Sequence, residues 1–516
     1  MKLNKYIVWG MGALMSVAAT SCVGDLDLKP NDPNKKLELT TVEEWDGFLA
    51  RLYGNLYRDD VITTSDGGAG SFTRAHFNLQ EITADECFIS EVWNDPGYQP
   101  LNMNTWSDNN EWIYACFARE FFNAKMGAEF ITKMREQGAA FYDDAEVKAR
   151  IAEASALRGL AYYMMIDLFG RGPWIDESSV TGAIPPTYDR KQLFDAITAE
   201  LKTYVPDLKP AAQQAYGRVS REAGYMLLAK LYLNAEVYTG TAMWTECAEA
   251  LKNVVGTGIT LAETYKYLFC STNDKYVGNG EILWAVPQQQ GRMETWGGTT
   301  YLTAGCWMAK PADPAILTQV NSNSGYIWEG LRIRPELSKA LKGDPRRLIY
   351  EGTYQEEIPS LKGNEATSCG YMLIKYSNSP EDDYLNTAGD NNNGSGMSNI
   401  DYPLFRLADA YLMLAECQLH GVQCNGLDYF NMVRERAGLD KVNALNEALI
   451  LNERMCELYM EGHRRSDLIR FGRYTGNTYL WSWKGGVYEG ASIMPERALY
   501  PIPYQYVETC GQNPGY

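Results

Sequence analysis

Apolar residues recur at intervals of three and four along most of this chain, and this spacing constrains the fold more than any other feature. The stripe Val147, Ile151, Ala154, Leu157 and Ala161 lies on one face of a helix. A Gly-Arg-Gly-Pro sequence at residues 170–173 then ends that helix, because it cannot continue one. Further stripes are found at residues 45–56, 112–134, 189–204, 220–235, 244–254, 404–419, 427–436 and 448–460. The chain is therefore predicted to be mostly α.

The predicted helices follow one another through short joints, which favours antiparallel helix pairs. Thr41 with Glu44 resembles a capping box, and Asp189 and Ser220 can each cap a helix. The pattern of Leu228, Tyr232 and residues 248–251 is loosely like a tetratricopeptide unit, although its period is irregular. Stacked pairs bury a continuous core and leave one face for partners. The expected fold is a tetratricopeptide-like scaffold of helix pairs.

Residues 256 to 400 differ from the rest, being rich in Gly, Asn, Ser, Pro and Thr. This loop-rich insertion is expected to carry short strands, one at residues 282–286, and a short helix at residues 331–341. Loops of this length inside a folded body are usually functional or disordered. The run at residues 389–396 superficially resembles a calcium loop, but Gly394 replaces an oxygen ligand and no closing Glu follows.

The first 22 residues have the layout of a targeting segment. Lys2 and Lys5 precede an apolar run that is too short and too interrupted by glycine to span a membrane. The run ends in Ala-Thr-Ser-Cys, a small-residue cleavage site before Cys22 that resembles a bacterial lipobox. We expect a lipoprotein signal peptide at residues 1–21, a lipid on Cys22, and a single domain over residues 22–516. A plain signal peptide is the alternative.

Charge and composition exclude several functions. The net charge of −18 argues against nucleic acid, whose phosphates need a basic face. Only three histidines occur, and no CxxC pair occurs among the 11 cysteines, so neither a metal site nor a cofactor is expected. A bridge between Cys417 and Cys424 is an open alternative to free thiols.

Several phrases, in order, resemble the SusD/RagB family of outer-membrane nutrient-uptake lipoproteins. They lie at residues 78–87 (NLQEITADEC), 156–170 (ALRGLAYYMMIDLFG), 405–416 (FRLADAYLMLAE), 461–472 (EGHRRSDLIRFG) and 512–516 (QNPGY). The resemblance covers essentially the whole mature chain. Residues 297–301 and 479–486 look most like the starch-binding branch of that family.

The resemblance implies a lipid-anchored protein on the outer face of the outer membrane. It implies a protein that binds a glycan, for example an α-glucan such as starch, and delivers it to a TonB-dependent transporter, without being an enzyme. Two alternatives stay open. The 65 acidic residues could supply the carboxylate pair of a glycoside hydrolase, and a helical-repeat scaffold could be an adaptor that binds only protein.

A sugar ring needs aromatic side chains for its C–H face and amide or guanidinium groups for its hydroxyls. Rigid Trp and Tyr rings supply such contacts at low entropy cost. Three non-periodic loops fit, around residues 93–98, 295–298 and 325–328, and Arg74 matches an arginine of the starch-binding branch. The predicted glycan-binding residues are Arg74, Trp93, Asn94, Trp296, Tyr326 and Trp328. The alternative for each ring is a place in the core.

The charged residues of the 461–472 phrase are Glu461, His463, Arg464, Arg465, Asp467 and Arg470. Catalysis is conceivable for such a group. Pairing along and between helices is the favoured interpretation, because charges three or four residues apart on a helix face each other. No catalytic residue is predicted.

Overall fold

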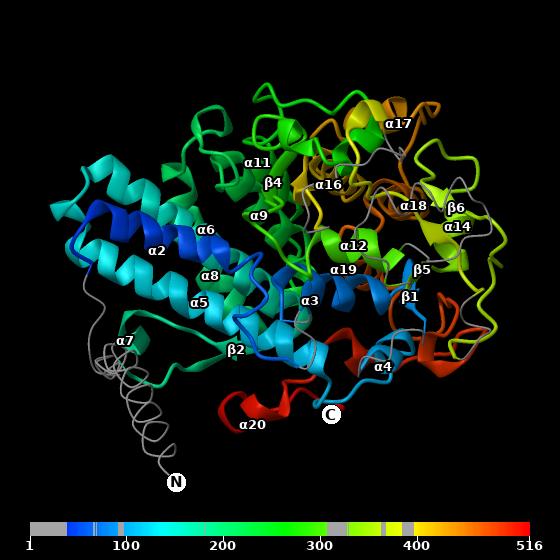
Figure 1. Ribbon diagram of the computed structural model, residues 1–516, viewed down its shortest axis with the longest axis horizontal. Coiled ribbons are helices and arrows are strands. Elements are labelled where there is room, and N and C mark those ends of the chain that lie inside the picture. Colours follow the sequence, from blue (N-terminus) through cyan, green and yellow to red (C-terminus); the bar gives the residue numbers. More distant parts are fainter. Residues whose placement is uncertain are drawn as a thin grey trace, which may run out of the picture. The chain divides into compact units, whose positions relative to one another are not determined.

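The computed structural model (Figure 1) describes residues 39–64, 68, 70–90, 97–180, 182–306, 328, 330–362, 368–383 and 397–516. The chain divides into two units, Met1–Gly47 and Phe48–Tyr516. In the described part of the first unit, Glu44 N donates to Thr41 Oγ1 at 3.2 Å and Thr41 N donates to Glu44 Oε2 at 3.2 Å. This reciprocal pair confirms the predicted capping box.

The structure is mainly helical, which confirms the predicted fold class. The helices are α2 (Val42–Gly54), α3 (Phe72–Phe77), α4 (Tyr98–Asn102), α5 (Glu111–Gln137), α6 (Asp144–Leu168), α7 (Glu177–Val180), α8 (Arg190–Tyr204), α9 (Arg221–Leu233), α10 (Ala235–Thr239), α11 (Trp244–Leu251), α12 (Thr299–Cys306), α14 (Pro335–Ala340), α16 (Leu407–Leu419), α17 (Gly426–Arg436), α18 (Glu447–Leu458), α19 (Arg464–Arg470) and α20 (Tyr504–Cys510).

The strands are short and pair antiparallel in two-stranded sheets among the described residues. They are β1 (Cys87–Ile89) with β5 (Leu331–Ile333), β2 (Arg171–Pro173) with β3 (Thr187–Asp189), β4 (Ile282–Val286) with β8 (Tyr402–Arg406), and β6 (Ile349–Tyr350) with β7 (Met372–Leu373). The pair β1–β5 matters for the site, since it ties the segment after α3 to the loop-rich region.

Helices α5 and α6 lie side by side (Figure 1), and α8 packs against α6 as well. Small residues allow this close packing. A Cβ added at Gly127 of α5 would lie 3.0 Å from Arg158 Cβ of α6, and one added at Gly159 of α6 would lie 2.8 Å from Leu201 Cδ2 of α8. From Ala149 to Leu168, α6 is consequently buried. The predicted helix at residues 147–168 is confirmed, and Asp189 caps α8 in a capping box with Gln192.

Two predicted boundaries are wrong. Residues 404–406 were expected to be helical but belong to β8, where Phe405 pairs with Trp284. Residues 331–333 were expected to begin a helix but form β5, and the helix begins only at Pro335. Both strands are buried along their whole length, and with three and five residues they are too short for their sequence pattern to distinguish a strand from a turn of helix.

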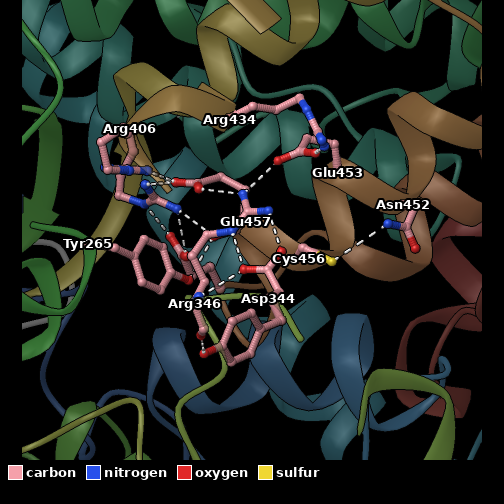
Figure 2. A network of polar contacts seen from close by, with 12 residues as sticks. Tyr265, Asp344, Arg346, Arg406, Arg434, Asn452, Glu453, Cys456 and Glu457 are labelled. Carbon is pink, nitrogen blue, oxygen red and sulfur yellow. Dashed lines mark hydrogen bonds and ion pairs between the residues drawn. The ribbon is translucent and has the colours of Figure 1, made fainter. Parts of the chain in front are cut away.

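A buried network of charges joins β8 to α18 (Figure 2). Arg406 contacts Glu457 at 2.9 Å and Glu461 at 2.6 Å, while Arg346 contacts Glu457 at 3.0 Å. Burial alone would raise the pKa of Glu457, but Arg436 together with these two arginines lowers it to about 2. Every charge in the network therefore has an opposite charge beside it, as a buried charge requires.

Most charged side chains of the 461–472 phrase are likewise in ion pairs, whereas Arg465 donates to the carbonyl oxygens of Arg497 and Ala498. Arg464 contacts Asp85 at 2.7 Å, Asp467 contacts Arg454 at 2.7 Å, and Arg470 contacts Glu416 at 2.5 Å. These ion pairs join α19 to α16, α18 and the segment before β1. The predicted pairing along and between helices is confirmed.

The ten cysteines of the described residues are free, Cys417 and Cys424 included. Cys424 Sγ donates to the Leu414 carbonyl at 3.2 Å instead of forming the bridge considered above. No described helix is both long and apolar enough to serve as a bilayer span. The proposed calcium-like run at residues 389–396 and the lipidation residue Cys22 lie outside the described residues.

Candidate functional site

Two loops that were predicted separately to carry binding aromatics meet in the structure. The rings of Trp296 and Trp328 have centroids 5.9 Å apart and planes inclined by 39°. Trp296 is 37% exposed, and Trp328 is half-buried. They come from the segments on either side of α12, which are distant along the chain. An exposed indole beside a second indole offers an apolar surface for the C–H face of a sugar.

The backbone of the Trp296 loop is fixed by one carboxylate. The Thr295 hydroxyl donates to Asp59 Oδ1 at 2.5 Å, and Trp296 N donates to Asp59 Oδ2 at 2.8 Å. Burial raises the pKa of Asp59, and the two hydrogen bonds oppose that rise. Both carboxylate oxygens are thus used to place the residue that carries the exposed indole.

Glycines bring this loop against the start of α3. A Cβ added at Gly297 would lie 1.8 Å from Ser71 Oγ and 2.6 Å from the Gly68 carbonyl oxygen. One added at Gly298 would lie 2.5 Å from Gln288 Oε1. At Gly297 the Gly68 backbone cannot move aside, so a side chain there would push the loop away from the start of α3, whereas at Gly298 the Gln288 side chain would have to shift.

Arg74 lies close to Trp296 but is buried beneath the protein surface. Its side chain is buried, donates to the Tyr98 hydroxyl at 2.8 Å, and lies over the rings of Trp112 and Tyr301 at 4.9 and 4.6 Å. Arg74 and Trp296 both border Gly68, where an added Cβ would lie 2.6 Å from Arg74 Nη1 and 3.2 Å from Trp296 Cβ. Arg74 is therefore next to the site, but in this structure its contacts are with the protein.

The segment that holds Asp59 is itself held by a buried arginine. Arg119 of α5 donates to the carbonyl oxygens of Asn55 at 3.0 Å, Arg58 at 2.9 Å, and Gly70. Burial lowers the pKa of Arg119 to about 10. The long helix α5 thereby anchors the loop whose carboxylate positions Trp296.

Of the six predicted glycan-binding residues, the structure brings Arg74, Trp296 and Trp328 together. Trp93, Asn94 and Tyr326 lie outside the described residues. Sequence reasoning missed Asp59, because an Arg-Asp-Asp triplet has the look of an ordinary solvated surface. Only the tertiary contact between residues 59 and 296 distinguishes Asp59 from Asp60.

Comparisons with known proteins agree with this picture. Residues 318–516 match the model of the SusD family. The starch-binding protein SusD of Bacteroides thetaiotaomicron is 29% identical, with 98% of this chain and 97% of that protein covered. A SusD-like protein of Bacteroides ovatus is 23% identical over 85% of this chain and 82% of its own length.

Solved structures show the same fold. A laminarin-binding SusD-like protein superimposes with a TM-score of 0.69 at 21% identity, covering 93% of this chain and all of its own. Surface glycan-binding protein A from Bacteroides thetaiotaomicron, in complex with laminarihexaose, gives a TM-score of 0.70 at 18% identity and covers 92% of this chain and 100% of its own. This chain thus matches the model of the SusD family over its C-terminal part, is similar to SusD-like proteins along its whole length, and shares their fold.

Proposed function

We propose that this chain is a cell-surface lipoprotein that binds a polysaccharide or oligosaccharide and delivers it to a TonB-dependent outer-membrane transporter. The observation that carries the proposal is the Trp296–Trp328 pair, an exposed indole on a rigidly held loop. Stacking on such a ring does not require the ring to reorganise, because Asp59 fixes its backbone beforehand.

The relatives support a glycan as the ligand. One full-length relative is named for starch binding, and two structural neighbours are named for laminarin binding or hold laminarihexaose. We favour an α-glucan such as starch, because the starch-binding relative matches this chain by sequence over almost its whole length. The chain is a binding protein rather than an enzyme, in line with those names.

Affinity electrophoresis tests the ligand. The mature protein is run in gels that contain starch, laminarin or no polysaccharide. Retardation by starch alone is the expected result, and retardation by laminarin alone would contradict the α-glucan. If neither glycan slows the protein, glycan binding loses its support and an adaptor that binds only protein becomes the better account. Release of reducing ends from the bound glycan would instead identify a hydrolase.

Delivery to a transporter is tested by co-purification. The protein is pulled down from native outer membranes in mild detergent, and a TonB-dependent barrel is expected with it. The absence of any such barrel from the eluate would contradict the proposed partner.

Anchoring through Cys22 has a simple test. Cys22→Ala is expected to move the protein from the membrane fraction into a detergent-free wash, since acyl chains contribute about 0.8 kcal/mol of membrane affinity per buried CH₂. Cys424→Ala is the matched control, because Cys424 is a partly exposed thiol of the folded body. Membrane retention of the Cys22 variant would contradict the lipid anchor.

A further inference from the structure

A cavity separate from the Trp296 site lies between α14, α18 and the segment that follows α19. Its volume is about 500 Å³, within the range of small-molecule sites. Helices α14 and α18 are neighbours (Figure 1), and both contribute residues to its lining. None of its lining residues belongs to the Trp296 site. The polar side chains that line it include Glu336, Lys339, Asn452, Arg464, Arg473 and Tyr479.

Most charges in this wall are already paired, although the exposed carboxylate of Glu447 also lines the cavity and has no ion pair among the described residues. Arg464 contacts Asp85 at 2.7 Å, and Asp85 also accepts from the Tyr479 hydroxyl at 2.5 Å. Glu336 accepts from Ser482 N at 2.8 Å, and Lys339 contacts Glu357 at 3.0 Å.

Arg473 is different. Its backbone N–H donates to the Leu468 carbonyl at 2.7 Å, but within the described residues its guanidinium has neither an ion pair nor a hydrogen bond. This guanidinium is therefore available to a ligand in the cavity. A guanidinium binds a carboxylate through two parallel N–H···O bonds, so its complement is a carboxylate.

The other lining residues of the cavity are suited to a ligand ring that has one apolar and one polar side. Leu451, Met455 and Phe471 supply an apolar surface, and the Tyr479 ring is half-buried beside them. The Asn452 amide can both donate and accept, as a ligand with several hydroxyls requires.

We propose that this cavity binds a carboxylate-bearing sugar, a uronic acid, with its carboxylate at Arg473, its C–H face toward Leu451 and Phe471, and its hydroxyls toward Asn452. The choice of a sugar over another carboxylate rests on the proposed glycan-binding function. An uncharged hexose lacks the group that Arg473 would bind. The protein would therefore have one neutral-glycan site at Trp296 and a separate site for an acidic sugar.

The test is calorimetric titration of the mature protein with glucuronate, methyl glucoside and acetate as separate probes. Glucuronate is expected to bind, and the other two are expected to bind at least about tenfold more weakly, because each lacks either the charge or the ring. Equal binding of acetate would show a simple carboxylate site and overturn the assignment to a sugar. No glucuronate binding by the unmodified protein would overturn it as well.

Variants locate the probe. Arg473→Gln is expected to weaken glucuronate binding at least about tenfold, Arg473→Lys less, and the exposed Arg51→Gln not at all. Trp296→Ala separates the two sites. Loss of glucuronate binding in Trp296→Ala, with binding kept in Arg473→Gln, would place the acidic sugar at the tryptophans and refute this cavity. Starch binding by the same proteins is measured independently, so failure of the proposed function and failure of this inference give different results.

Discussion

At the scale of single residues, the candidate site depends on the carboxylate of Asp59, which holds the backbone of the Trp296 loop. Asp59 accepts from the Thr295 hydroxyl and from Trp296 N, and removing it leaves two donors without an acceptor. An unmade hydrogen bond at a partly buried donor costs about 1–3 kcal/mol. The loop can escape that cost by moving toward water, and this movement would displace the indole.

Asp59→Ala is therefore expected to lower glycan affinity about tenfold with a small change in melting temperature, and Asp59→Asn, which keeps one acceptor, is expected to lower it less. Asp60→Ala is the control, since Asp60 is exposed and forms an ion pair with Arg58. Calorimetric titration and thermal unfolding are measured on all three variants. Equal affinities for the Asp59 and Asp60 variants would contradict the positioning role.

His76 gives the fold a pH dependence of known sign. Burial lowers the pKa of His76 to about 4, with the positive charge of Lys230 adding to the effect and Asp167 opposing it. Below the ordinary histidine pKa of about 6.5, the unfolded chain takes up a proton that folded His76 does not. The unfolding free energy should then fall with acidification, by up to about 1.4 kcal/mol per pH unit from this residue.

His76→Gln is expected to flatten that decrease between about pH 6.5 and about pH 4, while His420→Gln, at an exposed histidine, is not. Urea unfolding across the range measures the slope. Identical slopes for the two variants would show that His76 does not contribute to it.

At the scale of elements, close helix packing decides where glycine is required. Gly426 begins α17, and a Cβ there would lie 2.3 Å from the Leu414 carbonyl oxygen and 2.7 Å from Ala415 Cα of α16. Both atoms belong to the backbone, so no side-chain rotation relieves the overlap. Gly47 of α2, by contrast, has nothing within 4 Å of its added Cβ.

Replacing glycine by alanine should therefore have opposite effects on stability at Gly426 and at Gly47. Gly426→Ala is expected to destabilise the protein by about 1–3 kcal/mol through overpacking. Gly47→Ala is expected to stabilise it by about 0.5–1 kcal/mol, because alanine loses less entropy in a helix. Denaturant unfolding of both variants decides, and a stabilised Gly426 variant would contradict the packing of α17 on α16.

At the scale of the whole molecule, patterns within short stretches of sequence predicted the long helices but not the contacts between distant segments. Helical stripes and capping residues predicted α5, α6 and α8, because the apolar face of a long helix is visible in its own sequence. Short buried strands such as β5 and β8 were assigned to helices, since three to five residues are too few to show a period that separates a strand from a helix. At the site, Trp296 and Trp328 could be predicted from loop composition, whereas the role of Asp59 and the burial of Arg74 follow from contacts between distant segments.

The central claim is that Trp296 is a ligand-binding ring and not part of the core. The most direct measurement determines glycan affinity and melting temperature on the same Trp296→Ala protein, with Trp244→Ala as the control, because Trp244 is a half-buried indole that stacks on His420. We expect Trp296→Ala to weaken binding at least about tenfold, equivalent to about 1.4 kcal/mol, with an unchanged melting temperature. Unchanged affinity together with a large fall in melting temperature would contradict the account. That is the result expected for a core ring, whose truncation costs about 3–5 kcal/mol of folding stability.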